Sequence, residues 1–184
     1  MRNFTLSKQN TGLLVIDVQD KLFTLVERSG EVLSAMQQII KGFQVLGLPI
    51  VVTEQYPQGL GPTVAHLKET LGSKPLFIQK TSFSCMGDPI IKKQLLDMPV
   101  TQWVIIGIEA HVCVLQTARD LVAAGKEVVV LNDAISSRSI FDFSTAIAEL
   151  RDCGVRISSA ETVLFELVKD SQAPEFKQIS LLIK

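Results

Sequence analysis

The sequence predicts an α/β fold in which a mainly parallel sheet is covered by helices on both faces. Short β-branched runs alternate with longer segments of helical spacing about six times along the 184 residues. The runs are apolar throughout, which is typical of strands buried on both faces. Because no Pro/Ser-rich linker interrupts this pattern, we expect one domain that covers residues 1–184.

The expected elements follow from these runs in chain order. Helical spacing from Val32 to Leu46 predicts a helix closed by Gly47 and Pro49. Further helices are expected over 88–98, 114–122, 141–153 and in a segment that ends at Val168, while the tail 174–184 is either a helix or an arm docking on a neighbouring subunit. The expected strands cover 12–17, 48–53, 76–79, 103–107, 128–131 and 155–158.

Composition excludes several classes of protein. The net charge of −1 provides no basic field for nucleic acid. No apolar run approaches the ~20 residues of a membrane helix, and the first residues lack the apolar core of a secretory signal, so we expect a cytoplasmic protein. Three cysteines and two unpaired histidines fit neither a disulfide framework nor a zinc site, and we expect no metal or cofactor.

Ligands of an open parallel sheet bind beyond the carboxyl ends of its strands, so the residues there deserve inspection. Asp17 follows the first strand and is either a turn cap or a general base. Lys80 follows the third and is either solvated or aimed into the crevice. Cys113 starts the helix after the fourth and is either inert core or an activated thiol. The fifth strand places Asn132 and Asp133 at the same edge.

The other cysteines and the histidine near Cys113 are weaker candidates. Cys85 lies in a polar loop, and Cys153 completes an apolar helix face. His111 is two positions from Cys113, and residues at that spacing point to different sides of a helix. We therefore expect Cys113 alone to be selectively alkylated near neutral pH.

Three segments together resemble the signatures of the isochorismatase-like cysteine hydrolases. They are LVIDVQ over 14–19, Gln79-Lys80, and GIEAHVCV over 107–114; TEQYP over 53–57 and KTSFS over 80–84 look closest to the isochorismatase domain-containing subgroup. The resemblance implies a three-layer α/β/α fold with strand order 3-2-1-4-5-6, and a catalytic triad of Asp17, Lys80 and Cys113. It also implies a cis peptide at Ile108–Glu109 and an oxyanion hole made by the backbone N–H groups of Glu109 and Cys113.

One departure separates this chain from the nicotinamidases of that family. These carry an Asp-x-His metal motif after the second strand, where this chain reads Glu54-Gln55-Tyr56. We therefore expect activity without a metal. Candidates for the wall of the substrate pocket are Gln19, Phe23, Tyr56, Phe83 and His111, with Phe23 equally suited to the core.

The predicted function is hydrolysis of a small amide or imide C–N bond. A cysteine is only a few per cent thiolate at pH 7. A Lys80 ammonium at ~4 Å offers about 4 kcal/mol and Asp17 opposes it by a similar amount, so a near balance is expected, with Asp17 as proton acceptor. The alternative is a catalytically silent binding or assembly module on the same fold. The apolar tail 179–183 and the resemblance also predict a homo-oligomer.

Overall fold

A computed structural model describes residues 4–184 and shows a six-stranded parallel sheet in the order β3-β2-β1-β4-β5-β6. The predicted fold class and strand order are confirmed. Each strand pairs in parallel with its neighbours, so all carboxyl ends lie at one edge of the sheet. The strands are β1 (Thr11–Ile16), β2 (Ile50–Gln55), β3 (Leu76–Lys80), β4 (Gln102–Ile108), β5 (Glu127–Ser136) and β6 (Arg156–Ser158).

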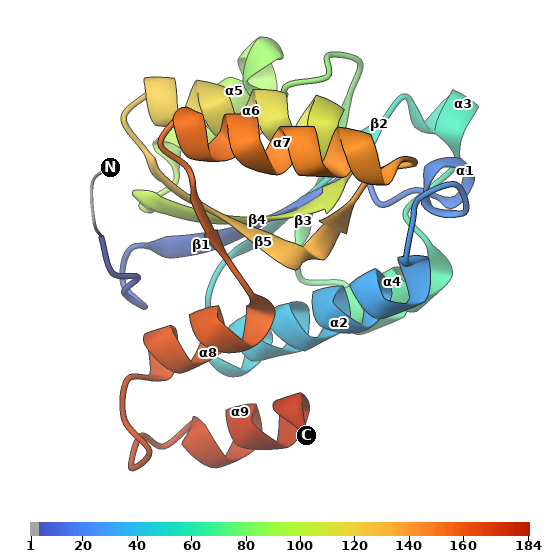
Figure 1. Cartoon of the computed structure of the whole chain (residues 1–184). Helices are drawn as coiled ribbons and strands as arrows, with labels where there is room; N and C mark the ends of the chain where they lie inside the picture. The colour runs from blue at the N-terminus through green and yellow to red at the C-terminus, as the bar shows by residue number, and fades with distance from the viewer. Residues whose placement is uncertain (1–3) are drawn as a thin grey trace.

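Helices cover both faces of the sheet (Figure 1). One face carries α2 (Ser29–Val45), α4 (Ala65–Leu71), α8 (Ala160–Val168) and α9 (Phe176–Ile183), and the other carries α5 (Pro89–Asp97), α6 (Leu115–Ala123) and α7 (Ile140–Asp152). Four short turns complete the fold: α1 (Asp20–Phe23), α3 (Pro57–Leu60), the 3₁₀ turn η1 (Cys85–Gly87) and the π-helical turn η2 (Ala110–Val114).

The sheet separates two apolar cores. Successive residues of β1 point to opposite faces, so Leu13 and Val15 join the core under α2 and α8. Leu14 and Ile16 join the core under α5, α6 and α7. Every residue of β1 and β4 is buried, which explains their unbroken apolar sequences. Two of the three side chains of the site described below, Asp17 and Cys113, follow these two enclosed strands.

Strand β5 is longer than its apolar run predicts. It continues through Asn132 and Asp133 to Ser136, because the β4–β5 register shifts between Ile105 and Gly107. The expectation that Asn132 and Asp133 lie beyond the strand is therefore wrong. The Asp133 carboxylate instead accepts from the Ala160 N–H at 3.1 and 3.0 Å, at the start of α8.

The tail forms helix α9 and packs on its own chain. Ile179 is fully buried in the core beneath α2 and α8, and Phe176, Leu182 and Ile183 pack against the same core. Of the two alternatives for the tail, the helix is the one observed. Ile179 consequently offers no surface to a neighbouring subunit, whereas Leu181 is 66% exposed. Among the described residues, no helix is long and apolar enough to span a bilayer.

Candidate active site

Three side chains from separate strand ends meet at the carboxyl edge of the sheet. Asp17 follows β1, Lys80 ends β3, and Cys113 lies in η2, directly after β4. The side chains of Asp17 and Lys80 have no exposed surface, and Cys113 is 6% exposed. The sequence placed these residues at strand ends, and the fold brings them into one buried cluster.

Asp17 and Lys80 form a buried ion pair. The Lys80 ammonium donates to Asp17 Oδ2 at 2.5 Å, and the Thr53 hydroxyl donates to Asp17 Oδ1 at 2.7 Å. Both carboxylate oxygens therefore have a donor within the protein. A buried charge is costly unless it is paired and hydrogen-bonded, and these two contacts meet that requirement for Asp17.

The Lys80 ammonium has further acceptors around it. It donates to Gln55 Oε1 at 2.7 Å and approaches the carbonyl oxygens of Ser82 and Phe83 at 3.1 and 3.0 Å. Burial alone would lower the pKa of Lys80, but Asp17 and the nearby thiols outweigh it and raise that pKa. Lys80 therefore stays protonated, and its ammonium donates its hydrogen bonds to acceptors within the protein.

The Cys113 thiol is protonated in the resting site. Burial, followed by the Asp17 charge and a hydrogen bond to Asp17, raises the pKa of Cys113 well above its ordinary value, while Lys80 only partly opposes this. The effects of Lys80 and Asp17 on the ionisation of Cys113 were expected to balance nearly. Burial and Asp17 together instead favour the protonated thiol. Selective alkylation of Cys113 near neutral pH is no longer expected, since Cys153 is the more exposed thiol.

A close contact between β1 and β4 fixes the distance between Asp17 and the nucleophile loop. Gly107 has a φ of +137°, and a Cβ there would lie 2.2 Å from the carbonyl oxygen of Ile16. Asp17 itself has a φ of 53° and leaves the strand sharply. Only glycine at position 107 allows the two backbones to approach this closely.

The loop after β4 begins with a cis peptide between Ile108 and Glu109. Glu109 precedes η2, and its carbonyl accepts from the N–H groups of Val112 and Val114. Its buried carboxylate accepts from the Arg138 side chain at 2.9 Å and from the Arg138 N–H at 3.2 Å. The backbone N–H groups of Glu109 and Cys113 thus belong to one turn anchored to the loop after β5.

Two of the five pocket-wall candidates have structural roles. Gln19 is fully buried; its amide donates to the carbonyl oxygens of Gln55 and Gly61 at 3.0 and 2.7 Å and accepts from the Gln55 N–H at 2.7 Å. Both amide hydrogens are used, so Gln19 supports the backbone beside Lys80 and has no donor left for a substrate. Phe23 is 9% exposed and belongs to the core, which is the other role considered for it.

The other three candidates lie around the buried cluster. Tyr56 and Phe83 are each 55% exposed and flank Lys80, since the Tyr56 N–H donates to the Lys80 carbonyl and the Phe83 carbonyl lies by its ammonium. His111 Nδ1 lies 3.0 Å from Ser137 Oγ, and its Nε2 is 4.0 Å from Asp142. The histidine therefore pairs with the loop after β5 and the start of α7.

Cys85 is the site residue that the sequence failed to identify. It is fully buried in η1, with its sulfur 4.0 Å from Thr53 Oγ1. Burial raises its pKa to about 11, although Lys80 lowers it. Its position five residues after Lys80 was the available signal, and the polar neighbours of Cys85 in the sequence concealed it.

The stretch that replaces the Asp-x-His motif is engaged in other contacts. The Glu54 carboxylate accepts from the Thr63 N–H and hydroxyl, both at 2.8 Å. Gln55 spans from Lys80 to the Thr81 carbonyl, which its Nε2 reaches at 2.7 Å. Within residues 4–184, no three His, Cys, Asp or Glu side chains are grouped to hold a metal ion.

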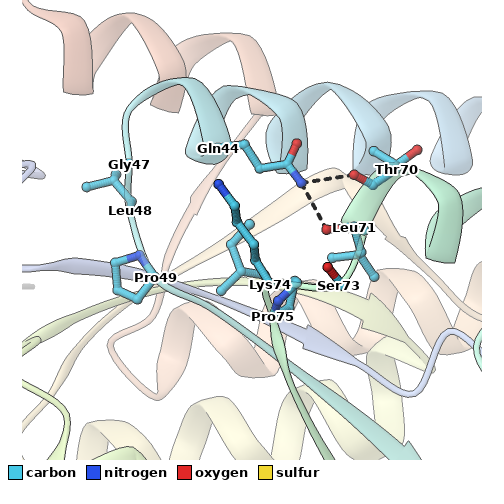
Figure 2. Close-up of a pocket in the computed structure, with 11 residues that line it drawn as sticks. Gln44, Gly47, Leu48, Pro49, Thr70, Leu71, Ser73, Lys74 and Pro75 are labelled. Carbon is cyan, nitrogen blue, oxygen red and sulfur yellow. Dashed lines mark hydrogen bonds between the residues drawn. The ribbon is translucent and has the colours of Figure 1, made fainter.

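Two of the hollows in the structure border strands β2 and β3. A groove of about 740 Å³ opens at the amino ends of β2 and β3, away from the triad, where Gln44 binds the carbonyl oxygens of Thr70 and Leu71 (Figure 2). A smaller hollow of about 250 Å³ lies at the triad end of β3, lined by Tyr56, Pro57, Gln58, Gln79, Lys80, Thr81 and Asp88. Of these two, the smaller one is lined by Lys80, and the residues that line the larger one include none of Asp17, Lys80 and Cys113.

Known structures share this architecture. The structure described as MAR1 ribonuclease from Caenorhabditis elegans is 37% identical, with a TM-score of 0.92 over 98% of this chain and 92% of that one. The YcaC gene product of Escherichia coli, described as an octameric hydrolase of unknown specificity, has a TM-score of 0.93 over 100% and 91% of the two chains. At 20% identity, the second shows the fold alone.

Sequence comparisons agree. Isochorismatase domain-containing protein 2 of Homo sapiens is 39% identical over 173 residues, which are 94% of this chain and 82% of that protein. Isochorismatase domain-containing protein 1 of Danio rerio is 40% identical over 97% of this chain, which spans only 62% of that relative's length. The model of the isochorismatase domain matches residues 11–162. The chain therefore belongs to the isochorismatase family.

Proposed function

We propose that the protein is a cysteine hydrolase that cleaves a small amide or imide C–N bond. The observation that carries the proposal is the buried cluster, in which the Asp17 charge acts on the Cys113 thiol and Asp17 is paired with Lys80. A protonated thiol beside a fixed carboxylate is the arrangement that nucleophilic catalysis with a general base requires.

The proposed reaction begins with proton transfer from Cys113 to Asp17 as the sulfur attacks the carbonyl carbon. The backbone N–H groups of Glu109 and Cys113 stabilise the resulting oxyanion. When the C–N bond breaks, Asp17 returns the proton to the leaving amine and an acyl-thioester remains on Cys113. Asp17 then takes a proton from the water whose oxygen attacks the thioester. As the C–S bond breaks, Asp17 returns that proton to the Cys113 sulfur, so the acid product leaves and the thiol is restored.

Lys80 has a supporting role in this scheme. Its ammonium is saturated by protein acceptors, so it contacts Asp17 rather than the substrate. It keeps Asp17 ionised while the carboxylate waits for the thiol proton, and it moderates the negative charge that develops on sulfur. Because the cluster is almost closed to solvent, the reacting group of the substrate must be small and neutral.

The test is a panel of small amides and imides, with release of ammonia or amine as the readout. We expect turnover by the wild type and none by Cys113→Ala, while Cys153→Ala retains full activity because Cys153 lies at the far end of α7. Turnover that survives Cys113→Ala, or no turnover of any member of the panel, contradicts the proposal.

The neighbour named as a ribonuclease suggests RNA as a second substrate to test. A net charge of −1 gives this chain little attraction for a polyanion. The buried triad also offers no surface on which a phosphodiester could lie. We therefore expect no cleavage of single-stranded RNA under the conditions in which an amide is hydrolysed.

We further propose that the protein is a homo-oligomer, which the octameric neighbour supports. Closed symmetric assembly is the common outcome for proteins of this size class. The apolar tail 179–183 no longer supports an oligomer, because Ile179 is buried within its own chain. The interface must therefore lie elsewhere on the molecule.

A further inference from the structure

Strand β3 is an edge of the sheet that lacks the usual protection of an edge. It pairs with β2 over five consecutive residues without a bulge. It contains no proline, and its one charged side chain, the inward-pointing Lys80, is the last residue of the strand, so residues 76–79 carry no charge. The opposite edge, β6, is protected by its length of only three residues. Because proteins normally blunt a longer edge with such features, β3 is suited to pair with another strand.

The pairing of β3 with β2 shows which backbone N–H and C=O groups of β3 have no hydrogen-bond partner in the sheet. The Lys80 carbonyl accepts from the Tyr56 N–H at 2.8 Å, so the backbone of Lys80 faces β2. Alternation along a parallel ladder turns Leu76 and Ile78 toward β2 as well, and turns the N–H and C=O groups of Phe77 and Gln79 toward the open edge. No backbone or side-chain group within residues 4–184 is bonded to these edge groups.

The side chains of β3 are unusually exposed for a parallel strand. Leu76 is 47% exposed and Phe77 is 38% exposed, whereas all of β1 and β4 is buried. Ile78 is half-buried and packs against the core under α5 and α6. An apolar edge with free backbone groups loses water-exposed surface and gains hydrogen bonds when another strand joins it.

We propose that a second copy of this chain pairs its β3 antiparallel to this one, about a two-fold axis at Ile78. Phe77 of one copy then faces Gln79 of the other, and each such pair exchanges both of its free N–H···O=C bonds. Ile78 meets its own counterpart, and Leu76 lies diagonal to the Ile78 of the second copy. A two-fold interface must be self-complementary, and the two-residue spacing of Phe77 and Gln79 fulfils that requirement.

Charge favours a second copy over an unrelated strand. Asp88 borders the hollow that also contains Gln79 and Thr81, at the carboxyl end of β3. Lys74 lies just before the strand, at its amino end. Antiparallel pairing places the amino end of one β3 beside the carboxyl end of the other, so Lys74 of each copy lies near Asp88 of its partner at both ends of the interface.

The experiment is light scattering on the full chain at micromolar concentration, with two variants in β3. Phe77→Arg places a charge at the edge, and Gln79→Pro removes an outward N–H that the monomer does not use. We expect the wild type to be an oligomer and both variants to be smaller species. Leu181→Arg, at a 66% exposed apolar position on α9, should leave the mass unchanged.

Amide hydrogen exchange provides a second readout at residue level. We expect the Phe77 and Gln79 amides to be protected in the wild type and to exchange rapidly in Phe77→Arg, while the Ile78 and Lys80 amides stay protected in both. A monomeric wild type, or an unchanged mass in a folded Phe77→Arg, overturns the proposal. If Gln79→Pro unfolds, Phe77→Arg decides alone. Neither readout depends on hydrolytic activity, so this proposal fails independently of the proposed hydrolysis. It does rest on the proposed homo-oligomer: a monomeric wild type contradicts both, whereas an unchanged mass in a folded Phe77→Arg contradicts the β3 interface alone.

Discussion

Asp17 has two opposite effects on Cys113 in the proposed reaction. Its charge and its hydrogen bond raise the pKa of Cys113, and the same carboxylate is the proposed acceptor of the thiol proton. Asp17 therefore lowers the reactivity of the resting Cys113 thiol and raises the rate of turnover. A substitution of Asp17 should change these two quantities in opposite directions.

Replacing Asp17 with Asn should accelerate alkylation of Cys113 and abolish turnover. Without the carboxylate, Lys80 stabilises the thiolate unopposed, and a one-unit fall in the pKa of Cys113 already raises labelling about tenfold below that pKa. The measurement is the iodoacetamide labelling rate of Cys113 between pH 7 and 10 by mass mapping, in a Cys153→Ser background. In the wild type, labelling should rise with pH across this range without a plateau. Slower labelling in Asp17→Asn would show that Asp17 does not control the thiol.

Removing only the charge of Lys80 should be far more damaging to stability than a surface substitution. Lys80→Met leaves Asp17 buried without its cation, and breaking a buried ion pair costs about 3–5 kcal/mol. We expect the free energy of unfolding in urea to fall by that amount, and the double variant Asp17→Asn/Lys80→Met to recover much of it. Equal losses for the single and double variants would mean that the pair contributes no coupling.

At the residue scale, the sequence predicted that Asp17, Lys80 and Cys113 act together, but not which residues support them. Asp17, Lys80 and Cys113 could be identified because each interrupts an apolar run or follows one at a strand end. Gln19 could not be assigned correctly, because its role depends on the backbone of Gln55, which lies 36 positions away. The protonation state of Cys113 also required the three-dimensional burial that the sequence does not encode locally.

Among the elements, strand ends were the least predictable feature. The apolar run of β5 stops at Leu131, yet the strand reaches Ser136 because the register shift opposite Gly107 extends its pairing with β4. That register shift depends on how two strands pair, so the apolar sequence of one strand alone cannot predict it. The short helices α1, α3 and α4 were missed for a similar reason, since tertiary packing stabilises segments too short to be helical alone.

Helix α9 provides a test at the scale of one element. Ile179→Ala should lower the free energy of unfolding by about 2–5 kcal/mol, because it opens a cavity where α9 meets α2 and α8. Leu181→Ala, at a 66% exposed position of the same helix, should change it little. Urea denaturation of both variants compares them directly. Similar small effects would mean that α9 is only loosely attached.

For the molecule as a whole, one carboxylate connects three distant segments of the chain. Glu166 in α8 accepts from the Leu6 N–H at 2.8 Å and binds the guanidinium of Arg156 in β6. Burial opposes its charge, but these partners lower the pKa of Glu166. A lowered pKa means that its contribution to stability is present above the ordinary value of 4.5 and is lost as the pH falls through the folded-state value.

Glu166→Gln should therefore be less stable than the wild type at neutral pH and converge with it in acid. Thermal unfolding between pH 7 and 3 measures the difference, with the exposed Glu161→Gln on the same helix as control. A difference between wild type and Glu166→Gln that persists at pH 3 would assign the loss to packing rather than to charge.

The architecture itself was the most predictable level. Six buried apolar runs separated by helical segments leave a parallel sheet covered on both faces as the available solution. The strand order came from the family resemblance, because the alternation of elements alone does not determine which strands are neighbours.

The buried ion pair also shapes how this family can lose its activity over time. Changing Cys113 to another small residue removes the nucleophile and leaves every buried charge paired. Changing Asp17 or Lys80 first leaves a buried charge without a partner, which lowers the free energy of unfolding by about 3–5 kcal/mol. Relatives that lose catalysis should therefore lose the cysteine at the position of Cys113 first and keep the Asp–Lys pair. An Asp–Lys pair without the cysteine would then indicate a protein that was once an enzyme.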